Sequence, residues 1–247
     1  MTPMGLGESY RHALALAQQE LGQASGAELA RRLAASGAEF LLPGSPGAGP
    51  GGAIRLSFLG RPVLVSLPDA RVVASLPDGV TVPRVPDAPV GTSPPDGGMV
   101  DVPQWLAILT LHYLNGASGD PLTGELIPFR DLPGGRVYDS NFEKRVRARL
   151  VRAFAHQPAL LVEAGRRLGG EAVEMGDATV RVLTFPRIPV WLVLWAADEE
   201  FPAQANVLFD SSVHSYLCTE DVVVLCEQVA SELISMSRKA EVGTDGA

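Results

Sequence analysis

The chain contains little cysteine: Cys218 and Cys226 are its only two, and it has no C-x-x-C motif. A four-cysteine zinc or iron–sulfur site within one chain is therefore excluded. If both cysteines lie on one helix, they are separated by about 12 Å, at about 1.5 Å per residue. Because this separation exceeds the reach of a disulfide, we expect two reduced cysteines.

Long apolar runs and an excess of basic residues are also missing. No stretch reaches the roughly 18 consecutive apolar residues of a membrane-spanning helix. The 20 basic and 28 acidic residues give a formal charge of -8, which argues against binding along a nucleic-acid backbone but leaves room for a local anion site. The first residues lack the basic leader of a signal peptide. We therefore expect a cytoplasmic protein with no nucleic-acid or membrane partner.

Signatures of catalytic sites are absent as well. The sequence has no P-loop, no G-x-S-x-G nucleophile motif and no H-E-x-x-H zinc motif. The glycine- and proline-rich residues 43–52 predict a flexible connection instead of a phosphate cradle, because no helix follows them. Motifs alone name no reaction, so candidate site residues must be argued from their places in the fold.

The N-terminal residues 1–76 predict a lobe of two helices and a β-hairpin. Ser25 and Glu28 match a capping box, and Gly37 suits the end of that helix. Residues 53–67 alternate between apolar and polar side chains on both sides of Gly60-Arg61, which is typical of a hairpin, and residues 70–76 suit a third strand. Residues 77–98 are rich in proline and predict a long loop before a main domain at 99–240.

Residues 101–170 predict helices. Asp101 with Gln104, and Ser140 with Glu143, match capping boxes for helices that end near Gly116 and His156. The first of these helices is apolar nearly all round, so we expect it in the core. A further helix is expected at 158–170. Near the C-terminus, residues 210–217 suit a short helix and Thr219 suits the cap of a long one.

Residues 171–210 predict four strands joined by connectors too short for a crossover helix. They should therefore pair as an antiparallel meander. The third, from Ile188 to Ala197, is apolar throughout apart from one proline and should be central. The predicted fold is a single α+β domain in which this meander packs with helices beside the N-terminal helices and hairpin.

The sequence D-E-E-F-P directly follows this buried strand. Asp198, Glu199 and Glu200 suit a solvated hairpin tip, where charge opposes edge-to-edge aggregation. The alternative is a site, with Asp198 and Glu200 pointing the same way into a cleft. Asp210 ends the next strand, a strand length from the turn, so a catalytic pair between it and the turn is disfavoured.

Two further groups carry site chemistry. On a helix, His214 would share a face with Cys218, and a third metal ligand would come from Glu220, Asp221 or Asp198 of the acidic turn. A packed, hydrogen-bonded histidine is the alternative. The basic residues Arg145, Arg149 and Arg152 form a stripe on the helix after Ser140. Pairing with nearby carboxylates is the simplest role for that stripe, and contact with an anion or a propionate is the other.

Several segments of the C-terminal half are together similar to one known family. These segments are FRDLPGGRVY, GDATV, FPRIPVWLVLWAADEEFPAQANVLFD and YLCTED. Over roughly residues 101–236 the chain resembles Domain of Unknown Function 3786, an uncharacterised domain family of bacteria and archaea, mostly anaerobes. Some relatives carry an added iron–sulfur domain of the kind seen in corrinoid iron–sulfur proteins. The resemblance implies a setting in anaerobic one-carbon or tetrapyrrole metabolism and maps no catalytic residue.

From residues and resemblance together we expect an accessory or ligand-binding protein, with a corrinoid or related tetrapyrrole as the candidate cofactor. An iron–sulfur or corrinoid protein is the corresponding candidate partner. The ligand is expected between the meander and the helices, near the residues His214, Arg130, Arg187, Asp198 and Glu200. A hydrolase that uses Asp198, Glu200 and His214 around a divalent metal is one alternative. A structural or regulatory interaction protein without a small ligand is the other.

Overall fold

The computed structural model describes residues 6–46, 48–75 and 99–244, and its chain divides into two compact units. The first unit is Met1–Asp120 with Ser215–Leu217, and the second is Pro121–His214 with Cys218–Ala247. Each unit contains a five-stranded antiparallel sheet and helices, so the predicted α+β class is confirmed. The loop predicted at 77–98 lies outside the described residues.

The first unit consists of three helices and a small sheet; two helices precede the first strand in sequence, and the third follows the last strand. Its strands follow the order β1-β2-β3-β4-β5. Its elements are α1 (Leu6–Gly22), α2 (Gly26–Ser36), β1 (Glu39–Leu41), β2 (Ala53–Phe58), β3 (Arg61–Ser66), β4 (Arg71–Ser75), β5 (Met99–Asp101) and α3 (Gln104–Gly116). Helix α3 belongs to this unit and packs against α1 and α2, whereas the sequence placed it in a main domain that begins at residue 99.

The N-terminal local predictions are confirmed. The Ser25 side chain accepts a hydrogen bond from the Glu28 amide, and Gly37 ends α2 with φ 69°. Strands β2 and β3 pair with Phe58 opposite Arg61, so Leu59 and Gly60 form a two-residue turn. Both have positive φ, 48° and 73°, as a type I′ turn requires.

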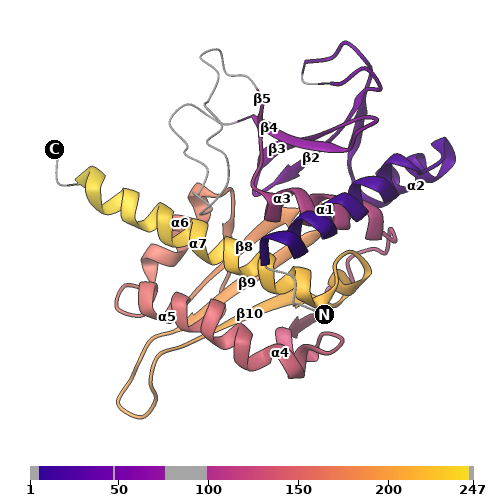
Figure 1. Ribbon diagram of the computed structural model, residues 1–247. Helices are drawn as coiled ribbons and strands as arrows, with labels where there is room; N and C mark the ends of the chain where they lie inside the picture. The colour runs from indigo at the N-terminus through magenta and orange to yellow at the C-terminus, as the bar shows by residue number, and fades with distance from the viewer. Residues whose placement is uncertain (1–5, 47, 76–98, 245–247) are drawn as a thin grey trace. The chain divides into compact units, whose positions relative to one another are not determined.

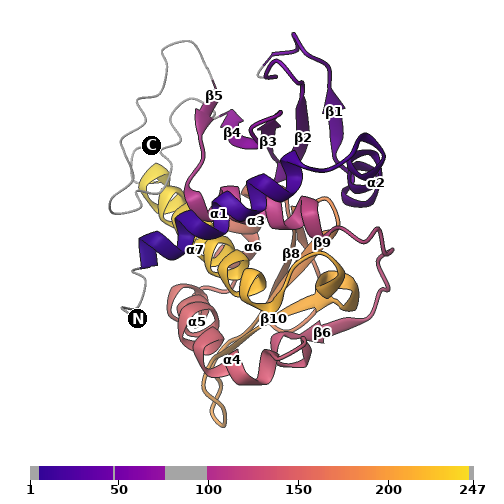
Figure 2. The ribbon, with the colours of Figure 1, turned by 45° about the vertical axis from the view of Figure 1, so that its right-hand side comes forward.

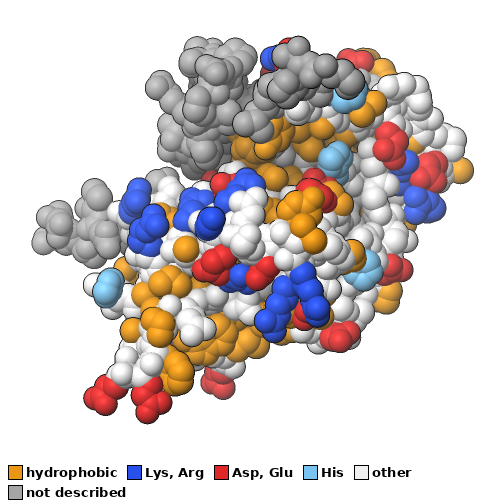
Figure 3. All heavy atoms as spheres, turned by 60° about the horizontal axis from the view of Figure 1, so that its bottom comes forward, with side chains coloured by type: hydrophobic (Ala, Val, Ile, Leu, Met, Phe, Trp, Pro, Cys, Tyr) orange, Lys and Arg blue, Asp and Glu red, His pale blue; other side chains and the backbone are white. Residues whose placement is uncertain are grey.

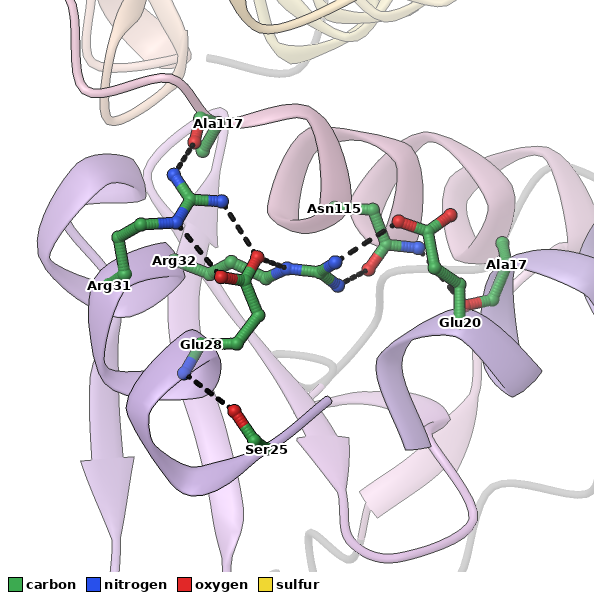
Figure 4. A network of polar contacts seen from close by, with 8 residues as sticks. All are labelled: Ala17, Glu20, Ser25, Glu28, Arg31, Arg32, Asn115 and Ala117. Atoms are coloured by element: carbon green, nitrogen blue, oxygen red, sulfur yellow. Dashed lines mark hydrogen bonds and ion pairs between the residues drawn. The ribbon is translucent and has the colours of Figure 1, made fainter. Parts of the chain in front are cut away.

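A buried guanidinium joins the three helices of the first unit (Figure 4). Arg32 is 8% exposed and lies on α2. Its Nε donates to Glu28 Oε1 at 2.8 Å, its Nη1 to Asn115 Oδ1 at 2.6 Å, and its Nη2 to Glu20 Oε1 at 3.1 Å. Since Glu20 is on α1 and Asn115 on α3, one side chain fixes the mutual positions of all three helices.

The predicted cap of α3 is wrong. Asp101 is the last residue of β5, and its two carboxylate oxygens accept from Arg71 Nε at 2.6 Å and Nη2 at 2.7 Å. This bidentate ion pair on neighbouring strands occupies the carboxylate that the capping box would need. Pro103 precedes α3 and makes no side-chain cap. The prediction that α3 lies in the core is confirmed, because eight of its residues are buried.

The second unit is built on the predicted meander, which is confirmed. The sheet order is β6-β10-β9-β8-β7, with every neighbouring pair antiparallel. Its strands are β6 (Leu126–Pro128), β7 (Glu171–Ala172), β8 (Ala178–Phe185), β9 (Ile188–Trp195) and β10 (Gln204–Asp210). Strand β9 is central, as expected from its apolar sequence. Helices α5 and α6 cover one face of this sheet, where a Cβ at Gly165 of α6 would lie 2.1 Å from Val180 (Figure 2).

The helices of the second unit match the sequence in part: the helix predicted at 158–170 is confirmed, and the one predicted from Ser140 begins earlier, at Gly135. They are α4 (Gly135–Phe142), a π-helical segment (Glu143–Arg147), α5 (Ala148–Phe154), α6 (Ala159–Arg167) and α7 (Thr219–Thr244). The first three run on without a break, so Ser140 and Glu143 lie inside a helix and the predicted cap is wrong. Residues Ser211–Ser215 form a 3-10 turn. Thr219 is the first residue of α7, and its hydroxyl donates to the Pro133 carbonyl at 2.6 Å.

A buried carboxylate closes the sheet at the end of β10. Asp210 is 2% exposed, and its oxygens accept from the backbone amides of Thr123, Gly124 and Ser212 at 2.8–3.0 Å. The hydroxyls of Thr123 and Ser212 donate to it as well. Desolvation raises the pKa of Asp210, but these donors outweigh it and hold the pKa at about 2. The anion thereby anchors the segment before β6 and the 3-10 turn after β10.

We expect Asp210→Asn to lower the free energy of unfolding by about 2 kcal/mol at neutral pH, because the charged acceptor is lost. The folded-state pKa lies below the unfolded value, so the native carboxylate stabilises the fold above about pH 4 and loses this effect as the pH falls toward about 2. Urea titrations of both proteins should therefore converge at low pH. Glu199→Gln, at an exposed position, is the control. A difference in the free energy of unfolding between the wild type and Asp210→Asn that stayed constant with pH would contradict this account.

Candidate functional site

The acidic turn after β9 is a hairpin tip that satisfies its own backbone. Asp198, Glu199 and Glu200 are all exposed. Asp198 Oδ1 accepts from the amides of Glu200 at 2.8 Å and Phe201 at 2.6 Å, and these bonds lower the pKa of Asp198. Of the two roles that the sequence left open for these carboxylates, the geometry favours the solvated tip.

The predicted pocket between this turn and His214 does not exist. Strand β10 separates the two, since the turn leads into Gln204 and His214 follows Asp210. Seven residues of strand span about 20 Å at about 3.3 Å per residue. The prediction fails because the two ends of one extended strand lie at opposite ends of the sheet. Arg187, in the β8–β9 turn, is at the His214 end of the sheet and not at the acidic end.

Arg130 lies elsewhere again, in the 3-10 turn before α4. A hollow of about 340 Å³ is lined there by Arg130, Arg136 and the glycines Gly134 and Gly135 at the start of α4, with Asp131 and Leu132. The five predicted ligand residues therefore occupy three separate places, and the structure brings no three of them together.

The predicted metal ligands do not assemble either. Cys218 precedes α7 and His214 sits in the 3-10 turn, so the two do not share one helical face as the sequence suggested. Asp198 is a strand length away. Among residues 6–46, 48–75 and 99–244, no three histidine, cysteine or acidic side chains lie close enough to hold a metal ion. The hydrolase built on Asp198, Glu200 and His214 loses its geometry for the same reason.

Cys218 is exposed but not activated. Desolvation of its sulfur raises the pKa of the Cys218 thiol to about 12; the Asp221 amide offsets this in part, and the Asp221 carboxylate adds to it. The thiol donates to Asp221 Oδ2 at 3.1 Å. Cys226 is fully buried in α7, and burial raises its pKa too. Neither thiol is poised as a nucleophile near neutral pH.

The structure reveals a different candidate, a groove between α5 and α7, which we call the arginine groove. It encloses about 690 Å³. Its lining residues are Arg149, Arg152, Ala153, Ser231, Ile234, Ser235 and Arg238. Ala153 and Ile234 supply apolar surface, and the three arginines supply hydrogen-bond donors, whereas the Ser231 hydroxyl already donates to the Glu227 carbonyl at 2.8 Å. Figure 3 shows Lys and Arg side chains gathered on the face that carries these helices.

The three positions of the basic stripe have different partners. Arg145 is ion-paired with Glu227 of α7. Arg149 donates to Ser231 Oγ at 2.8 Å and to the carbonyls of Arg145 and Glu227, which orients its guanidinium beside the groove. Arg152 is exposed and has no hydrogen bond or ion pair within the described part of the chain. The stripe thus divides into a paired end at Arg145 and an unpaired end at Arg152.

Arg238 of α7 adds the second unpaired cation of the groove. It is exposed and, like Arg152, makes no polar contact with any residue that the structure describes. Arg238 was not among the residues predicted from the sequence, although Ser231, Ile234 and Arg238 follow one another at the three- and four-residue spacing of a helix face. That spacing was the available signal.

The π-helical segment sets the rotation of α5 about its own axis. The Ala148 amide bonds to the Glu143 carbonyl, five residues back, where an α-helix would bond four back. Each residue turns an α-helix by about 100°, so this wider turn changes which side chains of α5 face α7. Phe142 stacks on Phe129 at 4.0 Å between ring centroids and packs under Arg147 at 5.5 Å, which fixes the segment. Helical π-segments are frequent at functional sites.

We expect Cys218 to react slowly with iodoacetamide despite its exposure. With a pKa of about 12, its thiolate fraction and its alkylation rate should rise about tenfold per pH unit from about pH 7 to about pH 9, without a plateau. Peptide mapping by mass spectrometry separates it from Cys226, and free cysteine is the reference. A plateau below about pH 9 would show an activated thiol and contradict the assignment.

Comparisons with known proteins identify one family for this chain. Within the residues that the structure describes, no helix is both long and apolar enough to cross a membrane. No curated protein matches the chain, and no solved structure matches it. One family model, described as Domain of unknown function (DUF3786), matches residues 89–232, which is more than half of the chain. The match includes Arg149, Arg152 and Ser231 and ends before Arg238. The chain belongs to the family described as Domain of unknown function (DUF3786).

Proposed function

We propose that this protein is an accessory binding protein that takes an anionic small molecule in the arginine groove. One observation carries the proposal: Arg152 and Arg238 border a groove of about 690 Å³ and have no acceptor among the residues that the structure describes. Surface arginines commonly pair with carboxylates, as Arg145, Arg147 and Arg167 do in this unit. Two unpaired arginines beside an oriented third leave donors for an external anion.

The chemistry of the groove selects the class of ligand. Guanidinium groups match the planar geometry of carboxylates and the oxygens of phosphates, and they stay protonated across the physiological range. Ala153 and Ile234 lie between the charges, which suits a ligand with an apolar body and one or more acidic groups. Because the formal charge of the chain is -8, non-specific attraction of anions to the rest of the surface is weak, so an anion should bind preferentially at this local cationic site.

A tetrapyrrole with carboxylate side chains remains one member of this class. The groove residues fit its propionates through Arg149, Arg152 and Arg238. The lining contains no histidine, cysteine or methionine, so this site offers a central metal no axial side-chain ligand. The proposal for a corrinoid or related tetrapyrrole therefore rests on its acidic groups alone, and His214 is no longer part of it.

The test is a binding titration with citrate, inorganic phosphate and haemin as separate probes. We expect at least one to bind wild-type protein, and Arg152→Gln with Arg238→Gln to weaken it at least about tenfold, since a hydrogen bond to a charged group contributes about 1.5–3 kcal/mol. Calorimetry measures the first two probes and the absorption spectrum measures haemin.

The control is Arg166→Gln, which removes an exposed arginine of α6 that also lacks a polar partner within the described residues. It should leave affinity unchanged. An equal loss of affinity in the control and in the groove variant would show that the effect comes from net charge alone. If none of the probes binds, the proposed function is overturned.

A further inference from the structure

The loop between β9 and β10 carries, on a projecting tip, the most exposed aromatic side chain among the described residues of the second unit. Phe201 is 60% exposed. It directly follows the exposed carboxylates of Glu199 and Glu200. The loop extends away from the helices of its unit in both ribbon views (Figures 1 and 2). In Figure 3 acidic side chains lie at this projecting lower-left end. The exposed ring supplies apolar contact surface at the tip of the loop.

The tip is ordered by its own hydrogen bonds. The Asp198 amide donates to the Phe201 carbonyl at 3.0 Å, while Asp198 Oδ1 receives the amides of Glu200 and Phe201. At the base, the Ala196 amide donates to Asp177 Oδ2 at 2.7 Å. A partner that binds this tip therefore meets a preformed shape, which lowers the entropy cost of association.

The arginine groove has the chemistry that complements this tip. Its apolar surface, from Ala153 and Ile234, suits the ring of Phe201, and Arg152 and Arg238 suit the carboxylates of Glu199 and Glu200. Arginine also packs favourably over an aromatic face, as Arg147 does over Phe142 within this unit. Both surfaces are exposed in one chain, and the tip projects away from its own unit, so a second copy is the occupant that brings them together.

We infer that the β9–β10 tip of one copy docks in the arginine groove of a second copy, so that self-association competes with the anionic ligand for the same arginines. The inference rests on the proposed function, because it takes the groove as a site for carboxylates. Reciprocal docking gives a closed two-fold dimer, with two identical contacts. The ion pairs are partly exposed, so the association should be weak and should fall with salt.

Sedimentation velocity over a range of protein concentrations tests the inference. We expect a reversible dimer whose dissociation constant rises at least about tenfold between about 50 mM and about 500 mM salt. Phe201→Ser should raise it by a similar factor, whereas Leu122→Ser, at a position 44% exposed in the same unit, should not. A monomer at all concentrations, or a dimer indifferent to Phe201→Ser, would overturn the inference.

Charge reversal gives a more specific test of this contact. Glu199→Lys with Glu200→Lys, and separately Arg152→Glu with Arg238→Glu, should each weaken the dimer. Mixing the two variants should restore both contacts in a heterodimer. The lysine tip of one variant meets the glutamate groove of the other with the signs exchanged, and the remaining contact joins a wild-type tip to a wild-type groove. Circular dichroism confirms that both variants are folded. A mixture that stays monomeric while the wild type dimerises places the contact elsewhere and contradicts the inference.

Phe201→Ser also separates this inference from the proposed function. If that variant binds citrate or phosphate through Arg152 and Arg238 while the wild type never dimerises, the inference fails and the proposed function stands. If the wild type dimerises through the tip and Phe201→Ser binds none of the anion probes, the proposed function fails and the groove is a protein contact alone. Dimer dissociation by citrate in the wild type would support the competition directly.

Discussion

The antiparallel pairing of β9 with β10 is the constraint on which the layout of the second unit depends. Strand β9 is buried in the middle of the sheet, and the register that sets Val207 opposite Leu192 leaves no freedom in the direction of β10. One end of β10 is therefore the projecting acidic loop, and the other is Asp210. The buried Asp210 carboxylate then fixes both the chain before β6 and the turn after β10, so the ends of the sheet are rigid and chemically different.

This constraint also explains why the proposed site lies on the helices and not at the ends of the strands. The length of β10 separates Asp198 from His214, and the Asp210 carboxylate already accepts hydrogen bonds from backbone amides and hydroxyls. On the helical layer, the Arg149 contacts with α7 orient one guanidinium, and Arg152 and Arg238 have no acceptor among the residues that the structure describes. An oriented guanidinium beside two such arginines suits the recognition of an anion.

Much of the fold was readable from the sequence, because it depends on local rules. Short connectors require an antiparallel meander, an uninterrupted apolar run requires a central strand, and Ser25 and Gly37 bound a helix by hydrogen bonding and backbone geometry. The failures have a common cause. Asp101 and Ser140 match capping boxes. Asp101 instead forms an ion pair with Arg71, which is distant in sequence, and Ser140 lies within a longer helix. Strands of three residues, such as β6, are too short to show any periodicity.

The candidate site was predicted less well than the fold. The basic stripe was recognised from its spacing, but its partner Arg238 is 86 residues beyond Arg152, and only tertiary structure joins them. The pocket near His214 assumed that both ends of one strand share a rim, which the geometry of any extended strand forbids. Carboxylates that follow a buried strand are conspicuous in sequence, whereas an unpaired arginine is recognisable only once every nearby acceptor has been placed.

The most direct measurement of the central claim is the NMR signal of each arginine side-chain Nε–Hε group during addition of citrate. The account predicts that the Arg152 and Arg238 signals shift with a shared saturation curve, and that the Arg166 signal does not move. Equal small shifts at all arginines, or shifts confined to residues outside the groove, would contradict it and leave the groove without a ligand.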